Sequence, residues 1–298
     1  MWNKILDASI YYSFDLSGFL RHSKGFDESI VFPKQTKCII TGGTSGIGHA
    51  AAKFMAKQNV QVVITGRDEC KGTQAAAPFN NITFEKCDLA NWDEVRKIVT
   101  NLEPLDYVVL NAGGMPDKFQ TNKESIELQF ASQLFGHYYL IKELKEQNKL
   151  NQNCRIVWVS SGGMYLKKLD LSPIFEDKEY NKVSTYANVK RAQVALLPRI
   201  QAEFQDYKIF AMHPGWVETP GVTSAIPDFA RTMKGRLRSP LQGADTILWL
   251  LATQKKIESG KLYFDRRKVK DHLFFFTRSS NKKINELWTV LSKYRNNK

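Results

Sequence analysis

The segment TGGTSGIG, Thr41–Gly48, limits the choice of fold more than any other feature of this chain. It follows a short apolar run, Lys37–Thr41, and precedes a helix-length segment, Gly48–Gln58. Glycines at such a strand-to-helix turn let the backbone approach a phosphate, and the N–H groups and dipole of the helix N-terminus attract it. The spacing therefore predicts a dinucleotide-binding turn. The residues expected to face the cofactor are Gly42, Thr44, Ser45, Gly46, Ile47 and Gly48.

Short apolar runs alternate with longer helix-like segments through most of the 298 residues. This alternation is typical of a parallel sheet covered by helices. We therefore expect an α/β fold, a single doubly wound parallel-sheet (Rossmann) domain with helices on both faces. The expected strands are Lys37–Thr41, Val60–Thr65, Ile82–Lys86, Tyr107–Asn111, Arg155–Ser160, Lys208–His213 and Lys261–Phe264. Further expected helices are Trp92–Leu102, Lys123–Gln147 and Thr185–Phe204.

The two ends of the chain lie outside this core. We expect an N-terminal extension over 1–36, the Rossmann domain over 37–265 and a basic tail over 266–298. A helix is stabilised mainly by burying its apolar face, so each end must dock on the core, on a partner or on a membrane. We expect at least one end to mediate attachment, with the tail the better candidate. The apolar positions at helical spacing are Trp2, Ile5, Leu6, Ile10 and Phe14 in the extension and Ile284, Leu287, Trp288 and Leu291 in the tail.

Positive charge is concentrated near the C-terminus. The net charge is +13, and thirteen Lys or Arg stand against four Asp or Glu from Lys255 onward. An anionic membrane surface, an acidic protein neighbour and plain solvation all suit such a segment. Nucleic acid also attracts basic segments, but this one lies away from the motifs, and nucleic acid is not expected as a partner.

The cysteines and the absence of long apolar runs bear on the compartment. Cys38, Cys70, Cys87 and Cys154 show neither CxxC nor zinc-like spacing, so no metal site is expected. Free thiols of this kind indicate a reducing, intracellular compartment. No apolar run reaches the roughly 18 residues that a spanning helix needs, and the start resembles neither a signal nor a transit peptide. A cytoplasmic, a peripheral-membrane and a mitochondrial location all remain open.

The end of the second expected strand bears on the choice of cofactor. In NAD-binding Rossmann folds an acidic residue, roughly 20 residues past the glycine turn, binds the ribose 2′-OH. Here Gly66 ends the strand and Arg67 follows it. A guanidinium pairs well with a 2′-phosphate. The sequence therefore predicts NADP(H) rather than NAD(H), with Asp68 partly offsetting the preference.

Six short motifs occur in the order found in the short-chain dehydrogenase/reductase superfamily, which the chain resembles from about residue 37 to 265. They are TGGTSGIG at 41–48, CDL at 87–89, NAG at 111–113, VSS at 159–161, YxxxK at 186–190 and PG at 214–215. Longer stretches narrow the resemblance to the retinol-dehydrogenase-like group. These are VSSGGM at 159–164, YANVKRAQV at 186–194, MHPGWVETPGV at 212–222 and QGADTILWL at 242–250.

The resemblance implies a catalytic group made of Ser161, Tyr186 and Lys190. Tyr186 is expected to act as the acid in carbonyl reduction or as the base in alcohol oxidation. A free tyrosine has a pKa near 10, too high for efficient proton exchange at neutral pH. Lys190, one helical turn away, is expected to lower that pKa and to bind the nicotinamide ribose. Ser161 is expected to hydrogen-bond the substrate oxygen.

The resemblance also implies a cofactor cleft at the carboxyl ends of the strands, where ligands bind in open α/β sheets. Asp88 and Leu89 would lie against the adenine. Asn111, Ala112 and Gly113 would wall the cleft. The nicotinamide end would be lined by Pro214, Gly215, Val217 and Thr219.

One position departs from the family pattern. The family has Asn before the serine strand, in an N-x-x-G pattern, where it organises a water that relays protons to the lysine. Here Gln133 stands at that place, with Gly136 aligned. Gln has similar donors and acceptors but one more methylene, so the relay is expected to be displaced, and either reduced turnover or a retired active site would follow. Cofactor binding is not affected.

The substrate side is expected in Thr219–Ser239. This segment offers Val222, Ile226, Phe229 and Met233 beside Arg231, Lys234, Arg236 and Arg238, with Met164, Tyr165 and Trp216 nearby. A wide apolar pocket for a lipophilic carbonyl or alcohol, such as a retinoid, steroid or fatty aldehyde, is one interpretation. Packing of these apolar residues on the core is the other.

Two functions from different classes follow. The first is an NADP(H)-dependent oxidoreductase that moves a hydride between nicotinamide and a lipophilic carbonyl, favoured by Ser161, Tyr186 and Lys190. The second is a non-catalytic subunit of a larger membrane or mitochondrial assembly that keeps the nucleotide as a structural group. Gln133 and the two ends of the chain favour that alternative. A soluble nucleotide-sensing module explains the ends less well.

Overall fold

The central sheet has eight strands in the computed structural model, which describes residues 9–294. The strand order is β3-β2-β1-β4-β5-β6-β7-β8, and every neighbouring pair is parallel except β7 and β8. The order reverses between β1 and β4, which opens a crevice at the carboxyl ends of these strands. The strands are β1 Lys37–Thr41, β2 Gln61–Gly66, β3 Ile82–Lys86, β4 Leu105–Leu110, β5 Leu150–Val159, β6 Lys208–Met212, β7 Leu262–Phe264 and β8 Arg267–Lys268.

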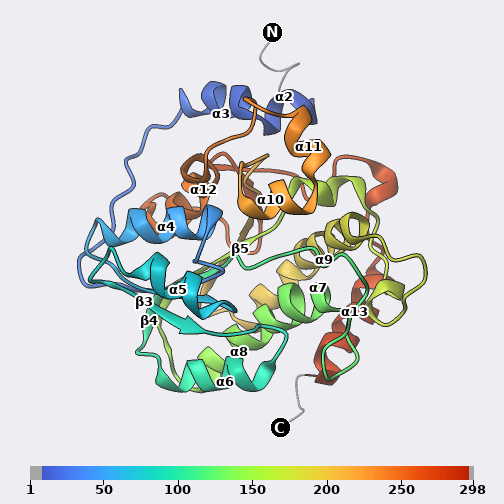
Figure 1. The fold of residues 1–298 in the computed structure, drawn as a ribbon, viewed down its shortest axis with the longest axis horizontal. Coiled ribbons are helices and arrows are strands. Elements are labelled where there is room, and N and C mark those ends of the chain that lie inside the picture. Colours follow the sequence, from blue (N-terminus) through green and yellow to red (C-terminus); the bar gives the residue numbers. More distant parts are fainter. Residues whose placement is uncertain (1–8, 295–298) are drawn as a thin grey trace.

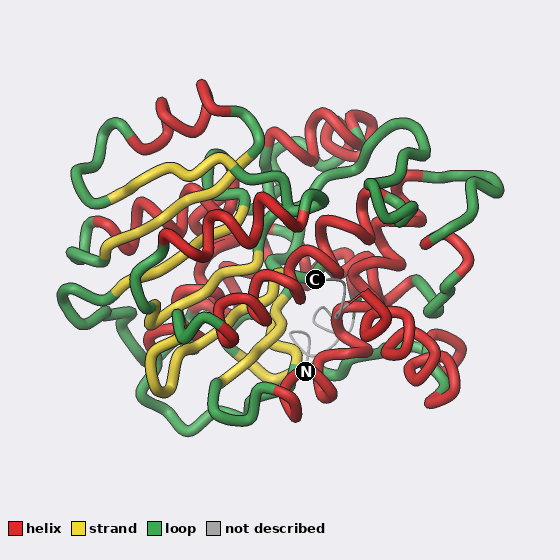
Figure 2. Tube along the Cα trace, turned by 90° about the horizontal axis from the view of Figure 1, so that it is seen from below, coloured by secondary structure: helices red, strands yellow, loops and turns green. Residues whose placement is uncertain are grey.

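Helices cover both faces of the sheet (Figures 1 and 2). The α-helices are α2 Ile10–Phe14, α3 Leu16–Ser23, α4 Gly46–Ala56, α5 Glu69–Ala76, α6 Trp92–Asn101, α7 Leu128–Phe130, α8 His137–Glu146, α9 Lys182–Glu203, α10 Pro220–Ala225, α11 Pro227–Thr232, α12 Pro240–Ala252 and α13 Asn281–Lys293. Shorter turns are the π-helical η1 Ala131–Gly136 and the 3-10 segments η2 Gly162–Leu166, η3 Ser172–Ile174 and η4 Phe275–Thr277.

Alternate strand residues enter two separate cores because strand side chains point to opposite faces. Ile39 packs with the core that includes α6, α8, α9 and α13. Its neighbour Ile40 packs with the core of α4 and α12. Burial on both faces explains why these strands are continuous apolar runs in the sequence. The predicted α/β fold class is confirmed.

The helix expected over Lys123–Gln147 begins later than predicted. The carboxylate of Glu127 accepts hydrogen bonds from the backbone N–H groups of Gln129 and Phe130, which caps α7 and starts the helix there. The first five residues of the expected helix, 123–127, are not helical. They belong to a turn that is closed by a β-bridge between Thr121 and Glu127. After α7 the helix widens into η1, and π-helical turns of this kind occur frequently at functional sites.

The described parts of both ends dock on the chain's own core. Phe14, Leu287 and Leu291 are buried members of one core cluster. The Trp288 ring meets Tyr138 of α8 edge-on, with the ring centroids 6.1 Å apart. The predicted apolar positions Trp2, Ile5 and Leu6 lie outside the described residues. In the described part of the chain, no helix is both long and apolar enough to cross a bilayer.

Candidate active site

The turn between β1 and α4 needs its glycines for steric reasons. Gly42 has a φ of +65°, and a Cβ there would lie 2.7 Å from the Cα of Ala112. A Cβ on Gly48 would lie 2.5 Å from the side-chain nitrogen of Asn111. That amide donates hydrogen bonds to the carbonyls of Thr41 and Gly42, both at 3.0 Å, and so holds the turn in shape. Asn111, which directly follows β4, therefore stabilises this turn.

This geometry meets the requirements of a dinucleotide. Helix α4 begins at Gly46 directly after the turn, so its unpaired N–H groups and positive dipole end face the crevice. Thr44 and Ser45 stand at the mouth of the turn and are not buried. The chain's predicted phosphate-binding residues are thus brought together at one place.

The nicotinamide end predicted from the sequence also converges on this turn. A Cβ on Gly46 would lie 3.1 Å from the methyl group of Thr219. Val217 and Ile47 both lie close to Gly243, where a Cβ would be 2.6 Å from Val217 and 3.2 Å from Ile47. Thr219 also caps α10, because its hydroxyl accepts from the N–H of Val222 at 3.2 Å.

Pro214 and Gly215 also contact the N-terminal extension and Arg238, a role that their motif does not predict. Gly215 has a φ of +75°, and a Cβ there would lie 2.6 Å from the carbonyl oxygen of Phe14. The Pro214 carbonyl accepts a hydrogen bond from Arg238 at 3.2 Å. The N-terminal extension therefore lies directly behind the predicted nicotinamide end of the cleft.

The three predicted catalytic residues meet at the end of β5. Ser161 follows β5, and Tyr186 and Lys190 lie one turn apart on α9. Ser161 lies close enough to Tyr186 to act on the pKa of its hydroxyl. The Lys190 amine lies 5.3 Å from the centre of the Tyr186 ring and donates to the Val159 carbonyl at 3.0 Å. The catalytic motif is thus assembled in space, although its members come from two elements.

Burial opposes the lowering of the Tyr186 pKa that the resemblance implies. Burial raises the pKa of Tyr186 to about 12, and the hydrogen bond with Ser161 opposes that rise only in part. Burial also lowers the pKa of Lys190 to about 7. Lys190 donates to the Val159 carbonyl, so its amine lies between that oxygen and the Tyr186 ring.

The titration of Lys190 should be measurable as a stability change. Because the folded pKa is about 7 and the ordinary value is 10.5, the unfolded chain binds more protons between these values, and stability due to this group rises with pH. Lys190→Met should therefore be more stable than the parent near neutral pH. The gap should narrow by about 2 kcal/mol between about pH 7 and pH 9, at about 1.4 kcal/mol per pKa unit.

Urea denaturation of parent and variant at the two pH values, without cofactor, measures this difference. Groups that titrate in both proteins cancel in the comparison. A gap that stays constant or widens as the pH rises would contradict the assignment.

Gln133 contacts the cofactor wall and the catalytic helix. Its side-chain amide donates to the Gly114 carbonyl at 2.8 Å, and a Cβ on Gly113 would lie 3.0 Å from its side-chain oxygen. Its backbone carbonyl accepts a hydrogen bond from Gln193 of α9 at 2.7 Å. Gln193 lies three residues after Lys190 and was not assigned by the sequence analysis, although a glutamine on a buried helix face is a usable signal. The Gln133 side chain therefore points toward Gly113 and Gly114.

The loop at Asp88 and Leu89, predicted to lie against the adenine, is stabilised by short hydrogen bonds. The Asp88 carboxylate accepts from the N–H of Ala90 at 2.9 Å, and the Glu94 carboxylate accepts from the N–H of Asp88 at 2.8 Å. Gly136 allows η1 to approach this loop, because a Cβ there would lie 2.1 Å from the Leu89 carbonyl oxygen. The glycine of the N-x-x-G pattern is therefore a packing requirement.

The end of β2 leaves no room for a carboxylate at position 66. A Cβ on Gly66 would lie 2.8 Å from the methyl group of Thr44. Arg67 is exposed, and within residues 9–294 it forms no ion pair. Asp68 caps α5 by accepting from the N–H of Lys71 at 3.0 Å. Asp68 is thus engaged with the N-terminus of α5, whereas the exposed Arg67 forms no ion pair within the described residues.

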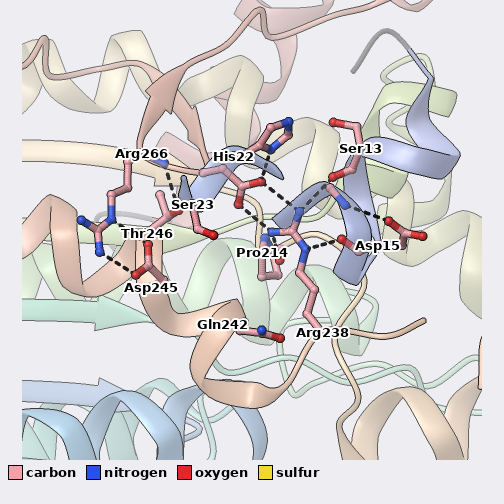
Figure 3. A network of polar contacts seen from close by, with 12 residues as sticks. Ser13, Asp15, His22, Ser23, Pro214, Arg238, Gln242, Asp245, Thr246 and Arg266 are labelled. Atoms are coloured by element: carbon pink, nitrogen blue, oxygen red, sulfur yellow. Dashed lines mark hydrogen bonds and ion pairs between the residues drawn. The ribbon is translucent and has the colours of Figure 1, made fainter. Parts of the chain in front are cut away.

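The substrate side differs from the expectation. Met164 and Tyr165 are buried in the core, and the Tyr165 hydroxyl donates to the Lys270 carbonyl at 2.8 Å, so these two residues do not form an open wall. Trp216 and Phe229 do face each other, edge to face, with ring centroids 5.4 Å apart. Arg238 is fully buried in a polar network with the N-terminal extension (Figure 3). The buried arginine therefore serves the fold and is not a cation at the pocket.

Comparisons with known proteins agree with this geometry. The model of the short chain dehydrogenase family matches residues 36–228. Dehydrogenase/reductase SDR family member 12 of Homo sapiens is 34% identical over 255 residues, covering 82% of this chain and 80% of that protein. Polyprenol dehydrogenase of Homo sapiens is 28% identical, with 80% and 79% covered. Retinol dehydrogenase 12 of Homo sapiens is 26% identical, with 85% and 84% covered.

Solved structures share the fold. A putative uncharacterized protein from Mycobacterium paratuberculosis superposes with a TM-score of 0.71 at 20% identity, covering 89% of this chain and 95% of that one. The crystal structure of BdcA in complex with NADPH superposes with a TM-score of 0.63 at 20% identity, covering 77% and 92%. The resemblance predicted from the order of the motifs is thus confirmed, and the chain belongs to the short-chain dehydrogenase/reductase family.

Proposed function

We propose that this protein is an NADP(H)-dependent oxidoreductase that interconverts a lipophilic carbonyl compound and its alcohol. The observation that carries the proposal is the contact of Ser161, Tyr186 and Lys190 beside a turn that accepts a dinucleotide. When bound, the reduced nicotinamide supplies the hydride for the carbonyl carbon.

The chain's own residues handle the proton and the orientation. The Ser161 hydroxyl hydrogen-bonds the substrate oxygen, next to the Tyr186 hydroxyl that it already contacts. Tyr186 gives its phenolic proton to that oxygen, which completes the reduction to an alcohol. Burial keeps Tyr186 protonated at neutral pH, so the phenol holds the proton that the reduction needs, and its transfer is efficient only when the pKa of Tyr186 is lowered toward neutral.

The lipophilic substrate class is supported by side chains near the nicotinamide end. Trp216 and Phe229 offer an aromatic pair there, and Tyr11 meets Trp216 from the N-terminal extension, with ring centroids 5.7 Å apart. The relatives named retinol dehydrogenase and polyprenol dehydrogenase have names that refer to long apolar alcohols. Both points favour a long apolar substrate.

A direct test is a turnover assay with purified full-length protein and NADPH. Retinal, a straight-chain aldehyde and a keto-steroid would be compared, and the loss of reduced-nicotinamide absorbance followed. Turnover of at least one of them supports the proposal. Tight cofactor binding with no turnover of any carbonyl would instead favour the non-catalytic subunit.

The preference for NADP(H) rests on Arg67 and can be tested separately. We expect NADPH to bind more tightly than NADH, and Arg67→Ala to lose about tenfold or more of that preference, because a charge-assisted contact to a phosphate contributes roughly 1.5–3 kcal/mol. Isothermal titration of both cofactors to parent and variant measures the ratio. Arg278→Ala, an exposed arginine far along the chain, is the matched control. Tighter NADH binding by the parent, or an unchanged ratio in Arg67→Ala, would overturn the assignment.

A further inference from the structure

Four consecutive apolar residues project into solvent just before α13. Leu273, Phe274, Phe275 and Phe276 are 47%, 39%, 83% and 55% exposed. The Phe274 and Phe276 rings stack with centroids 5.3 Å apart, and Phe275 stands at the tip. We call Leu273–Phe276 the apolar loop. Scattered exposed apolar side chains are ordinary, but a contiguous group usually marks an interaction site.

The loop is fastened to the domain on both sides by hydrogen bonds. Thr277, the next residue, is fully buried, and its hydroxyl donates to the Phe274 carbonyl at 2.8 Å. On the other side, Arg191 of α9 donates to the Asp271 carbonyl at 2.6 Å, and Tyr165 donates to the Lys270 carbonyl at 2.8 Å. A loop fastened at both ends loses little conformational entropy on binding.

The charges around the loop are almost all positive. Lys270, Arg278 and Lys282 are exposed, and Lys283 is partly exposed. The single nearby carboxylate of residues 270–283, Asp271, contacts the His272 ring at 2.6 Å. Aromatic side chains bordered by Lys and Arg fit an anionic membrane surface, where the rings enter the headgroup region and the cations pair with lipid phosphates.

We propose that the apolar loop inserts into the surface of an anionic membrane, with its neighbouring cations on the lipid headgroups. Charge complementarity favours this partner over a neutral surface, and the exposed apolar rings favour lipid over a polar acidic surface. The apolar face of α13 does not take part, because Leu287 and Leu291 are already buried against the core. The attachment predicted for the tail is thereby assigned to the loop that precedes its helix. In Figure 1 this segment lies near the right-hand edge of the molecule, above α13.

The test is sedimentation of full-length protein with vesicles, without cofactor or substrate. Binding is expected to vesicles of phosphatidylcholine containing about one third phosphatidylserine, to weaken with added salt, and to be much weaker with phosphatidylcholine alone. The double variant Phe275→Ser and Phe276→Ser should lower the partition coefficient by about tenfold or more, because two large apolar contacts are lost.

Phe175→Ser is the matched control. Phe175 is an exposed phenylalanine, at 46%, but it is followed by Glu176 and Asp177. This control should bind like the parent. Both variants should unfold thermally like the parent, because the replaced rings are exposed.

Three results would overturn the proposal. They are no binding of the parent to anionic vesicles, equal binding of the parent and the double variant, and an equal loss in Phe175→Ser. Retention of the parent in a particulate cell fraction without vesicle binding would point to a protein partner instead. None of these results depends on turnover, so they are separate from the test of the catalytic proposal.

Discussion

Tyr186→Phe should lower turnover by about 10²–10⁴-fold while cofactor affinity is largely kept. The substitution removes only the phenolic oxygen, which is the group that Ser161 acts on and that gives up the proton. The ring stays in place beneath the Lys190 amine, 5.3 Å from it, so the cofactor side of the site is little changed. Steady-state kinetics on the best carbonyl substrate and titration of NADPH by fluorescence measure the two quantities separately.

Tyr207→Phe is a suitable control for this experiment. Tyr207 follows the far end of α9 and packs at the edge of the core, away from Ser161. It should keep the parent's turnover. Lys190→Ala, by contrast, should weaken both turnover and cofactor binding, because the amine is expected to serve the ribose as well as Tyr186. Full activity of Tyr186→Phe on any substrate would refute the role of Tyr186 as the acid.

The inner strands could be predicted from the sequence because both of their faces are buried. Lys37–Thr41 has the predicted bounds, and β6 ends one residue before the predicted His213. The edge strand Ile82–Lys86 also has the predicted bounds, although it is largely exposed. Burial on two faces produces a short continuous apolar run, which is a strong signal at any position in the chain. The helices between these strands are instead amphipathic, so their apolar residues recur at helical spacing and distinguish them from the strands.

Helices with a weak apolar pattern escaped the sequence analysis. Helix α5 has Gly72 in its interior, and the reason is tertiary, because a Cβ there would lie 2.1 Å from the Phe84 ring of β3. The start of helix α12 could have been predicted, since Ser239 at the N-cap and Gln242 at the third helical position form a capping box, with Pro240 between them. The start of α7 could not be predicted from the sequence. Its cap is the carboxylate of Glu127, which is buried only once the chain has folded.

The order of the motifs predicted which residues gather at the site, but not how the charges there behave. That Lys190 turns toward Val159 and loses its charge readily follows from burial in the folded chain. The contact of Gln193 with the Gln133 carbonyl likewise joins two elements that no local pattern connects. The position of Arg238 is the clearest case, because two of its partners, Asp15 and Ser13, are 223 and 225 residues away in the sequence.

Arg238 links the N-terminal extension to the end of the catalytic domain (Figure 3). Its guanidinium donates to both carboxylate oxygens of Asp265, at 2.6 and 2.9 Å. It also donates to the backbone carbonyls of Ser13 at 2.9 Å and Asp15 at 3.2 Å. The side chain is fully buried. A buried charge with this many directed partners is costly to remove, because the partners lose their hydrogen bonds without gaining water.

The carboxylate of Asp265 depends on this arrangement. Burial would raise the pKa of Asp265, but the hydrogen bond with His22 and the charge of Arg238 hold the pKa below its ordinary value. Because the folded pKa is lowered, the stabilising contribution is present above the ordinary Asp value and is lost as the pH falls through the folded pKa. Without Arg238 the carboxylate would keep the hydrogen bond with the His22 ring, at 2.6 Å.

Arg238→Ala should therefore lower the free energy of unfolding by about 3–5 kcal/mol, the range seen when one member of a buried ion pair is deleted. Arg238→Lys should recover little of the loss, because an ammonium cannot hold both oxygens of Asp265 and two carbonyls at once. Arg231→Ala is the control, since its pair with Asp228 is 78% and 91% exposed and should contribute about 0–1 kcal/mol. Urea denaturation near neutral pH measures all three.

Limited proteolysis shows which part of the chain becomes accessible when Arg238 is replaced. Phe14 packs against Gly162, one residue past Ser161, where a Cβ would lie 2.4 Å from its ring. Its carbonyl accepts from the N–H of Trp216 at 2.8 Å. If Arg238 holds the extension in place, limited proteolysis of Arg238→Ala should cut within residues 9–36 before the Rossmann domain is attacked, and turnover should fall as the support behind Ser161 is lost. A stability loss no larger than that of Arg231→Ala, with an extension still resistant to protease, would show that Arg238 does not hold the two parts together.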